Sequence, residues 1–283
     1  MSVSAGDGEP GVEASSPHDH LDELELLNRG EIEIRGRIMP ASNATFFGTV
    51  TLDGVRIECV YKPVSGERPL WDFPDGTLAG REVAAYLVSE ALGWNIVPPT
   101  VLRGDAPAGT GMVQAWREPD VDQDPVDLVP TRSVPEGYLH VLDAYDGNDR
   151  PVSLVHEDCD PLRRMAVFDV VVNNADRKGG HVLAMTDGHR FGVDHGLAFN
   201  VDDKLRTVLW GWARESLDAD DADGVRALVD QLRSPGSMLC RALSRLLTGD
   251  EVAATLRRCE RLLRRNMMPQ PSGGRPSIPW PAF

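Results

Sequence analysis

Apolar and polar positions alternate through much of the first third of the chain, which is the pattern of half-buried β-strands. A short helical pattern over 21–29 precedes the alternating stretch EIEIRGRIM. The dipeptide Asp53-Gly54 separates two further alternating runs and favours a tight hairpin turn. A helix is predicted over 77–94, because Thr77 is a suitable N-cap and apolar residues then recur at helical spacing. Two extended stretches, IVPPTVLRG and GTGMVQAWRE, complete this strand-rich part.

The pattern changes after a connector rich in Pro and Asp at 119–136. Most later segments have helical spacing: GYLHVLDAY, DPLRRMAVFDVVVNN, DADGVRALVDQLRS, SMLCRALSRLLT and DEVAATLRRCERLLRRNMM. Between the second and third of these, HVLAM and RFGVD predict two short strands joined by a turn at Asp187-Gly188. The second half is therefore predicted to be mainly helical.

A chain of 283 residues exceeds the usual size of a single core, so two lobes or two small domains are expected. Residues 1–20 are acidic and rich in Gly, Ser and Pro, which predicts a disordered tail. We expect an N-lobe over 21–118 and a C-lobe over 119–268. The Pro-rich residues 269–283 predict an irregular C-terminal tail.

The formal charge of -15 disfavours non-specific binding to nucleic acid or to anionic bilayers. The four cysteines include no C-x-x-C pair, which favours reduced thiols over a zinc site or a disulfide framework. No apolar run approaches the roughly 18 residues of a membrane span, and the N-terminus lacks the pattern of a secretory signal. These features predict a soluble cytoplasmic protein with no stable membrane association.

Two clusters centred on Asp flank the predicted hairpin in NNADRKGGHVLAMTDGHRFGVDHGLAF. A hairpin brings its two ends together, so Asp176, His181 and Asp194 should converge. Phosphoryl transfer needs one carboxylate near the acceptor hydroxyl, and a second carboxylate with a neutral ligand to hold a divalent cation on the nucleotide phosphates.

The stretch from NNADRKGGH to VDHGLAF resembles the catalytic loop and metal-binding triplet of a bacterial family of phosphatidylinositol 3-/4-kinase-like proteins, related to HipA-type kinases. The resemblance covers about residues 36 to 215. It implies an α+β, two-lobed fold of the protein-kinase-like or phosphatidylinositol-kinase-like type, with a strand-rich N-lobe and a helical C-lobe. It also implies ATP and Mg²⁺ or Mn²⁺ as cofactors and a hydroxyl group as the phosphate acceptor.

By this resemblance Asp176 is the catalytic-loop Asp, and the neighbouring Arg177 and Lys178 are basic residues suited to nearby phosphates. Asp194 begins the metal triplet Asp-His-Gly. His181 occupies a metal-ligand position where these kinases usually have Asn, and imidazole suits Mn²⁺ better than Mg²⁺.

The resemblance assigns nucleotide contacts to the N-lobe. Lys62, at the end of the strand VYKP, would bind the α- and β-phosphates, with Glu82 as the helix residue that orients it. The remaining cofactor-binding residues are Ser42, Asn43 and Thr45 of a phosphate loop, and Val113, Gln114 and Ala115 of a hinge against adenine.

The sequence is compatible with several functions. The acceptor is a small molecule or a protein; a lipid kinase is disfavoured, because the region after Gly196 is more acidic than basic. His181 favours a nucleotide-binding pseudokinase. The residues His181, His189 and His195 also suggest a metallohydrolase, although none has the i, i+4 helical spacing of such sites.

A basic helix is predicted near the C-terminus. The segment 251–268 contains five Arg against two Glu within an acidic protein. Such a helix either lies on a membrane or, more commonly, packs its leucine stripe against the rest of the lobe.

Overall fold

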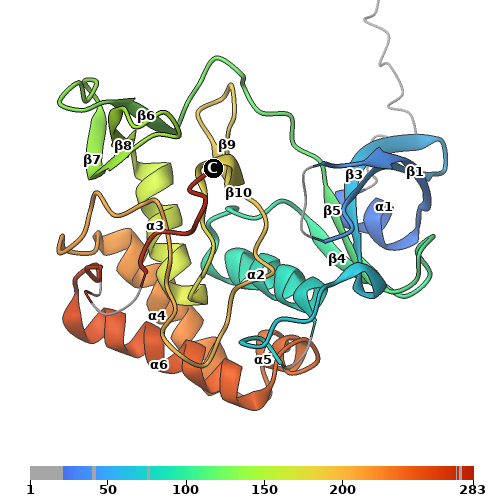
Figure 1. Cartoon of the computed structure of the whole chain (residues 1–283). Helices are drawn as coiled ribbons and strands as arrows, with labels where there is room; N and C mark the ends of the chain where they lie inside the picture. The colour runs from blue at the N-terminus through green and yellow to red at the C-terminus, as the bar shows by residue number, and fades with distance from the viewer. Residues whose placement is uncertain (1–21, 40–42, 75–76, 272, 274–275) are drawn as a thin grey trace, which may run out of the picture.

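Five antiparallel strands form the sheet of the N-lobe, which we describe from a computed structural model of residues 22–39, 43–74, 77–271, 273 and 276–283 (Figure 1). Their spatial order is β1 (Glu31–Arg37), β2 (Phe46–Leu52), β3 (Val55–Pro63), β5 (Gly111–Ala115) and β4 (Thr100–Arg103). Helix α1 (Glu23–Arg29) packs on one face, where its Leu27 joins Tyr61 and Val113 in an apolar cluster. Helix α2 (Leu78–Leu92) packs on the other face, against Met112.

The hairpin predicted at Asp53-Gly54 is confirmed as the β2–β3 turn. Asp53 has φ 49° and Gly54 has φ 85°, the two positive values that a type I′ turn requires. The seven paired positions of β2 and β3 continue without a bulge, so the turn fixes the register of the strand that ends beside Lys62.

Local hydrogen bonds define both ends of α2. The Thr77 side chain accepts a bond from Gly80 N at 2.9 Å, as predicted for an N-cap. The Glu67 carboxylate accepts bonds from Leu78 N and Ala79 N, which places an anion at the positive end of the helix. Gly93, with φ 70°, ends the helix.

The C-lobe is built around the buried helix α3 (Asp160–Val172). The other helices are α4 (Ala219–Arg233), α5 (Met238–Leu243) and α6 (Gly249–Arg265), and a short hairpin consists of β9 (Val182–Ala184) and β10 (Arg190–Gly192). The four helices predicted after residue 159 and the predicted hairpin at Asp187-Gly188 are confirmed. No helix in the described part of the chain has the length and apolarity needed to span a membrane.

A second sheet is the main departure from the predicted elements. It comprises β6 (Val126–Pro130), β8 (Pro151–Glu157) and β7 (Tyr138–Tyr145), in that order. The helix predicted for GYLHVLDAY is therefore wrong, and the connector at 119–136 contains a strand. The β7–β8 register shifts between His140 and Leu142, and such a bulge interrupts strict alternation, so the apolar positions of β7 resemble helical spacing.

The predictions for the two ends of the chain have different outcomes. The acidic tail predicted at 1–20 lies outside the described residues. The described part of 269–283 contains no helix or strand, yet it packs on the C-lobe: the Ser277 carbonyl accepts bonds from Thr207 N and Trp210 Nε1. Gly179 N in turn donates to Ala282 O at 2.8 Å. The predicted boundary at 118/119 falls between β5 and β6, in a stretch without helix or strand.

Candidate active site

Three elements from both lobes meet at Lys62. Its Nζ lies 2.6 Å from Glu82 Oε1 on α2 and 2.8 Å from Asp194 Oδ1, which follows β10. Alternation along β3 directs Lys62 to the same face as its partner Met112, the face that α2 covers. The predicted contact between Lys62 and Glu82 is present, and Asp194 joins it.

Lys62 and the two carboxylates shift one another's pKa values, and Lys62 favours the charged form of each carboxylate. Burial acts to lower the pKa of Lys62, but the carboxylates of Asp194 and Glu82 outweigh it and raise that pKa. The Lys62 ammonium holds the pKa of Asp194 well below its usual range. Burial raises the pKa of Glu82, and Lys62 opposes this effect. The ammonium and the Asp194 carboxylate are therefore both charged at neutral pH, and they bridge the lobes.

Asp176 lies on the loop that leaves α3. The helix ends at Asn173, which has φ 54°, and the Asn174 side chain then accepts a bond from Asp176 N at 3.0 Å. The Asn174 side chain thus orients the loop that carries Asp176. Lys178 Nζ lies 3.6 Å from Asp176 Oδ2. Burial raises the pKa of Asp176 to about 6, Lys178 lowers it, and Asp194 adds to the increase.

Arg177 is placed differently from the sequence prediction. Its side chain is fully buried and pairs with Asp169 of α3 at 2.9 Å. The guanidinium also donates to the carbonyls of His181 and Val193. A fully buried guanidinium is closed to a ligand outside the protein, so Arg177 supports the loop from within and does not contact phosphates.

His181 and Asp194 face each other across the hairpin ends. Val193 N donates to His181 O at 3.0 Å, so the predicted convergence is present. The ring Nδ1 of His181 lies 2.9 Å from Asp176 O, which assigns its proton to that nitrogen and leaves Nε2 as an acceptor. Burial lowers the pKa of His181, which keeps the ring neutral. Nε2 then lies 3.4 Å from Asp194 Oδ2, so two hydrogen-bond acceptors face each other without a donor between them.

The pair of His181 and Asp194 suits a divalent cation that binds together with nucleotide phosphates. Within the described ranges, no group of three His, Cys, Asp or Glu side chains could hold a metal ion by itself. Mg²⁺ on a nucleotide commonly takes only one or two protein ligands and completes its shell with phosphate oxygens and water. The imidazole Nε2 of His181 and the carboxylate of Asp194 supply such a set, with a nitrogen ligand that suits Mn²⁺.

His195, the middle residue of the triplet, connects the site to α2. Its backbone N–H donates to Glu82 Oε2 at 2.8 Å, so one carboxylate holds both Lys62 and the triplet. The imidazole is fully buried, packs edge-on against Phe168, and accepts a bond from Arg177 Nη2 at 2.6 Å. It thereby fills an apolar position through a ring that burial keeps neutral, its pKa lying well below the usual value.

The predicted phosphate loop lies between β1 and β2, and Ser42 is outside the described residues. The side-chain oxygen of Asn43 accepts a bond from Arg68 N at 2.9 Å. Thr45 is mostly buried, and its hydroxyl donates to the Asn43 carbonyl. The side-chain bonds of Asn43 and Thr45 therefore fix the loop itself, and phosphate contacts at this loop remain a prediction for its backbone.

The predicted hinge residues lie inside β5, not in the connection between the lobes. Val113 and Ala115 point into the apolar cluster beneath α1, away from the face that bears Lys62. Gln114 is on the Lys62 face, but it is buried and its amide donates to Thr100 Oγ1 at 2.8 Å. The chain leaves the sheet only after Ala115, so the connecting segment begins at Trp116.

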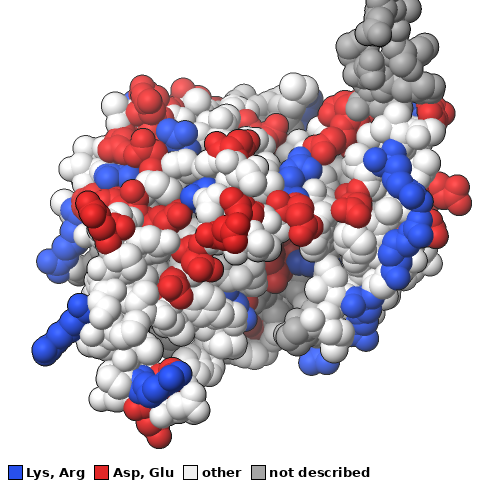
Figure 2. All heavy atoms as spheres, turned by 90° about the horizontal axis from the view of Figure 1, so that it is seen from above, with Lys and Arg blue, Asp and Glu red and all other residues white. Residues whose placement is uncertain are grey.

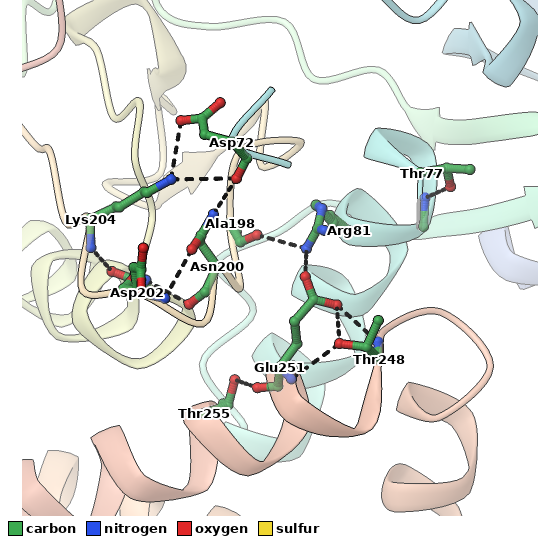
Figure 3. A network of polar contacts seen from close by, with 12 residues as sticks. Asp72, Thr77, Arg81, Ala198, Asn200, Asp202, Lys204, Thr248, Glu251 and Thr255 are labelled. Carbon is green, nitrogen blue, oxygen red and sulfur yellow. Dashed lines mark hydrogen bonds and ion pairs between the residues drawn. The ribbon is translucent and has the colours of Figure 1, made fainter. Parts of the chain in front are cut away.

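A polar network behind the site ties α2 to the C-lobe (Figure 3). Arg81 contacts Glu251 Oε1 of α6 at 2.5 Å and donates to Ala198 O at 3.2 Å. Glu251 also forms the capping box of α6 with Thr248. Arg81 of α2 thus holds the segment that follows Asp194-His195-Gly196.

Asp169 is a supporting residue that the sequence interpretation missed. It is fully buried within the apolar run MAVFDVVV, and its carboxylate receives bonds from Arg177, Asn174 and Thr207. A charged residue on the apolar face of a helix requires a partner, so the position of Asp169 in this run could have indicated a buried polar interaction. The sequence did not indicate which residue would pair with it.

The architecture is that of a protein-kinase-like fold. A crystal structure of the Golgi casein kinase with Mn/ADP bound aligns with a TM-score of 0.55 at 16% identity, covering 86% of this chain and 74% of that one. A second structure of the Golgi casein kinase aligns with a TM-score of 0.53 at 14% identity, covering 88% and 78%. The predicted α+β, two-lobed class is confirmed.

The chain belongs to the family of Protein Rv2133c from Mycobacterium tuberculosis (strain ATCC 25618 / H37Rv). The two are 54% identical over 271 residues, which cover 93% of this chain and 96% of the relative. No family model matches the chain. The resemblance to phosphatidylinositol 3-/4-kinase-like and HipA-type proteins therefore stays a prediction from the motifs.

Proposed function

We propose that this protein is an ATP-dependent phosphotransferase that requires a divalent cation and transfers the γ-phosphate to a hydroxyl group. The observation that carries the proposal is the position of Lys62 between Glu82 and Asp194. A strand Lys held by a helix Glu beside a metal-binding Asp is the arrangement that grips nucleotide phosphates in protein kinases.

Each residue has a distinct role in this proposal. Lys62 binds the α- and β-phosphates, while Asp194 and His181 hold Mg²⁺ or Mn²⁺, which neutralises phosphate charge when bound. Asp176 orients the acceptor hydroxyl and accepts its proton, and Lys178 lies beside it. The raised pKa of Asp176, about 6, supports this role, because its conjugate base is stronger than an ordinary Asp carboxylate and is still formed at neutral pH. The Golgi casein kinase structure with Mn/ADP supports nucleotide use by this fold.

A small molecule or a protein is the proposed acceptor. Seen from above, acidic side chains are spread over the C-lobe and the middle of the molecule, and basic ones form a band over the N-lobe (Figure 2). An acidic surface repels an anionic bilayer, which argues against a phosphoinositide acceptor.

A nucleotide-binding pseudokinase is the second candidate. His181 favours it, because an imidazole stands where the resemblance expects an Asn ligand. Both candidates bind a nucleotide, but only the phosphotransferase turns it over.

The test measures binding and turnover separately. Melting temperature is recorded with ATP, GTP or ADP and either Mg²⁺ or Mn²⁺, followed by release of phosphate and incorporation of labelled phosphate into the protein itself. Stabilisation by ATP and metal that is lost in Lys62→Ala supports a nucleotide site here. Stabilisation without any phosphate transfer or hydrolysis would favour the pseudokinase, and no stabilisation by any nucleotide would refute both.

A further inference from the structure

A cavity lies in the C-lobe, and neither Lys62 nor Asp194 lines it. It is open to solvent on one side, has a volume of about 720 Å³, and is lined by α6, the end of α3, the segment 203–214 and residues 267–270. Its apolar wall includes Trp210, Leu262 and Met268. The volume is in the range of small-molecule sites, which combine apolar walls with a few convergent polar groups.

The polar groups of this cavity are mainly cationic. Four arginines line it: Arg214, Arg258, Arg261 and Arg265. Asp203 is the single carboxylate among the described residues of its wall, and it lies 2.9 Å from Arg261. In a protein with a formal charge of -15, this excess of positive charge is concentrated in one concave site.

Three of the arginines share one face of α6. Arg258, Arg261 and Arg265 are separated by three and four residues, so their side chains neighbour one another on the helix. Like charges at these spacings repel and destabilise a helix. An anion bound in the cavity would relieve that repulsion.

Arg258 is a built feature of the cavity wall. It is 4% exposed, and its bonds go to neutral acceptors: Val171 O, Asn200 O and Thr255 Oγ1. Burial lowers its pKa to about 10, so the guanidinium remains charged at neutral pH. These hydrogen bonds go to neutral acceptors, and the nearby Asp203 carboxylate acts to raise the pKa of Arg258, so an anion bound in the cavity would add to that charge interaction.

We propose that this cavity binds a small organic phosphate. The phosphate would lie against Arg258, Arg261 and Arg265, since guanidinium groups bind phosphate oxygens through paired N–H donors. The apolar part of the ligand would pack on Trp210 and Met268. This ligand displaces Asp203 from Arg261.

The cavity is separated from the catalytic loop by one layer of backbone. Leu205 lines the cavity, and the next residue, Arg206, exchanges backbone bonds with Asn174 O and Arg177 N at 2.9 and 3.1 Å. The Asn173 side chain in the same wall donates to Asn200 O and Asp202 O. Ligand binding is therefore expected to order the segment that crosses the loop of Asp176.

Phenyl phosphate is the probe, with phenol and inorganic phosphate as its two halves. Calorimetry on the full chain without nucleotide or metal should show phenyl phosphate binding more tightly than either half. Arg261→Ala/Arg265→Ala should weaken it by roughly ten-fold or more, because charge-assisted bonds are lost. The matched control, Arg257→Ala/Arg264→Ala, removes the same charge from α6 outside the cavity and should bind as the wild type does.

The outcomes distinguish this site from the nucleotide site. Lys62→Ala should leave phenyl phosphate binding unchanged, whatever it does to ATP. Co-sedimentation of the protein with phosphatidylcholine vesicles, with and without phosphatidic acid, tests whether the bound phosphate belongs to a lipid. Co-sedimentation that requires phosphatidic acid and depends on Arg261 and Arg265 would assign the phosphate to a lipid headgroup. Equal affinity of both double variants for phenyl phosphate, or no binding by the wild type at millimolar concentration, would overturn the proposal.

Discussion

At the scale of single residues, Lys62 is central because its ammonium pairs with two carboxylates, those of Glu82 and Asp194. Lys62→Ala should weaken ATP binding by roughly 10- to 100-fold. This range corresponds to about 1.5–3 kcal/mol, the contribution of a hydrogen bond to a charged group. Glu82→Gln should weaken it less, since the amide oxygen can still accept from His195 N. Titration calorimetry measures both, with the exposed Arg56→Ala on the same strand as control. A larger loss in Glu82→Gln than in Lys62→Ala would mean that the roles are misassigned.

In the proposed site, His181 is expected to set the preference between Mg²⁺ and Mn²⁺. His181→Asn replaces a nitrogen ligand with an oxygen ligand, so activity with Mg²⁺ should hold or rise relative to activity with Mn²⁺. The ratio of the two rates in one phosphate-transfer assay is the measurement, and His189→Asn on the same hairpin is the control. A ratio that moves toward Mn²⁺ would remove His181 from the metal site.

Sequence reasoning found the residues whose positions follow from element ends. Asp176, His181 and Asp194 were expected together because a hairpin closes on itself, and Lys62 because it ends a strand. It assigned Arg177 to phosphates, since charge near a catalytic Asp suggests that role. The pattern of a loop does not specify which way a side chain points, and the pairing of Arg177 with Asp169 depends on the packed structure.

At the scale of elements, the contact between α2 and α6 fixes the helix that carries Glu82. Arg81 and Glu251 are both almost fully buried. Arg81→Met should lower the free energy of unfolding by about 3 kcal/mol, because it leaves a buried carboxylate without its cation. Arg29→Met, which breaks the exposed pair with Glu25, should change it by less than about 0.5 kcal/mol. Urea unfolding compares them, and equal effects would show that the buried contact carries no special stability.

The sheet of β6, β7 and β8 makes stability depend on pH through His156. Burial lowers the pKa of this His below its ordinary value of 6.5, and its neutral Nε2 accepts a bond from Gly211 N at 2.9 Å. The unfolded chain takes up the proton more readily, so the stabilisation is complete above about pH 6.5 and falls as the pH drops below it. His156→Gln keeps an acceptor without titrating. Its free energy of unfolding should decrease less between about pH 7 and pH 5 than that of the wild type.

The same sheet was not predicted, for a physical reason. Strand β7 contains a bulge, and β6 lies in a stretch of Pro and Asp that is typical of loops. Their strand conformation comes from pairing with β8, which is a tertiary interaction and outweighs local propensity. Helices α2, α3 and α6, by contrast, were predictable because caps and apolar spacing are local.

At the scale of the whole molecule, the pair Lys62–Asp194 joins the two lobes. A nucleotide–metal complex at this point contacts both lobes, so it should stabilise the protein as a unit by about 2.7 kcal/mol at a concentration 100 times its dissociation constant. Asp194→Asn should abolish this metal-dependent stabilisation, because the anionic ligand of the cation is removed. The two-lobed class was predictable from strands preceding helices, whereas the contact that closes the lobes was not.

Asp176→Asn should have the opposite effect to Asp194→Asn, because it should lower turnover and leave nucleotide binding intact. Its carboxylate faces the acceptor hydroxyl in our proposal and is not a phosphate or metal ligand, so the shift in melting temperature with ATP and Mg²⁺ should remain close to that of the wild type. Turnover should fall by roughly 100-fold or more, since an amide cannot accept the proton of the hydroxyl. Melting curves and a phosphate-release assay on the same preparations separate affinity from rate. If Asp194→Asn instead retains metal-dependent ATP binding, then Asp194 is not the metal ligand; if Asp176→Asn loses that binding, then the carboxylate holds the nucleotide and another group must accept the proton.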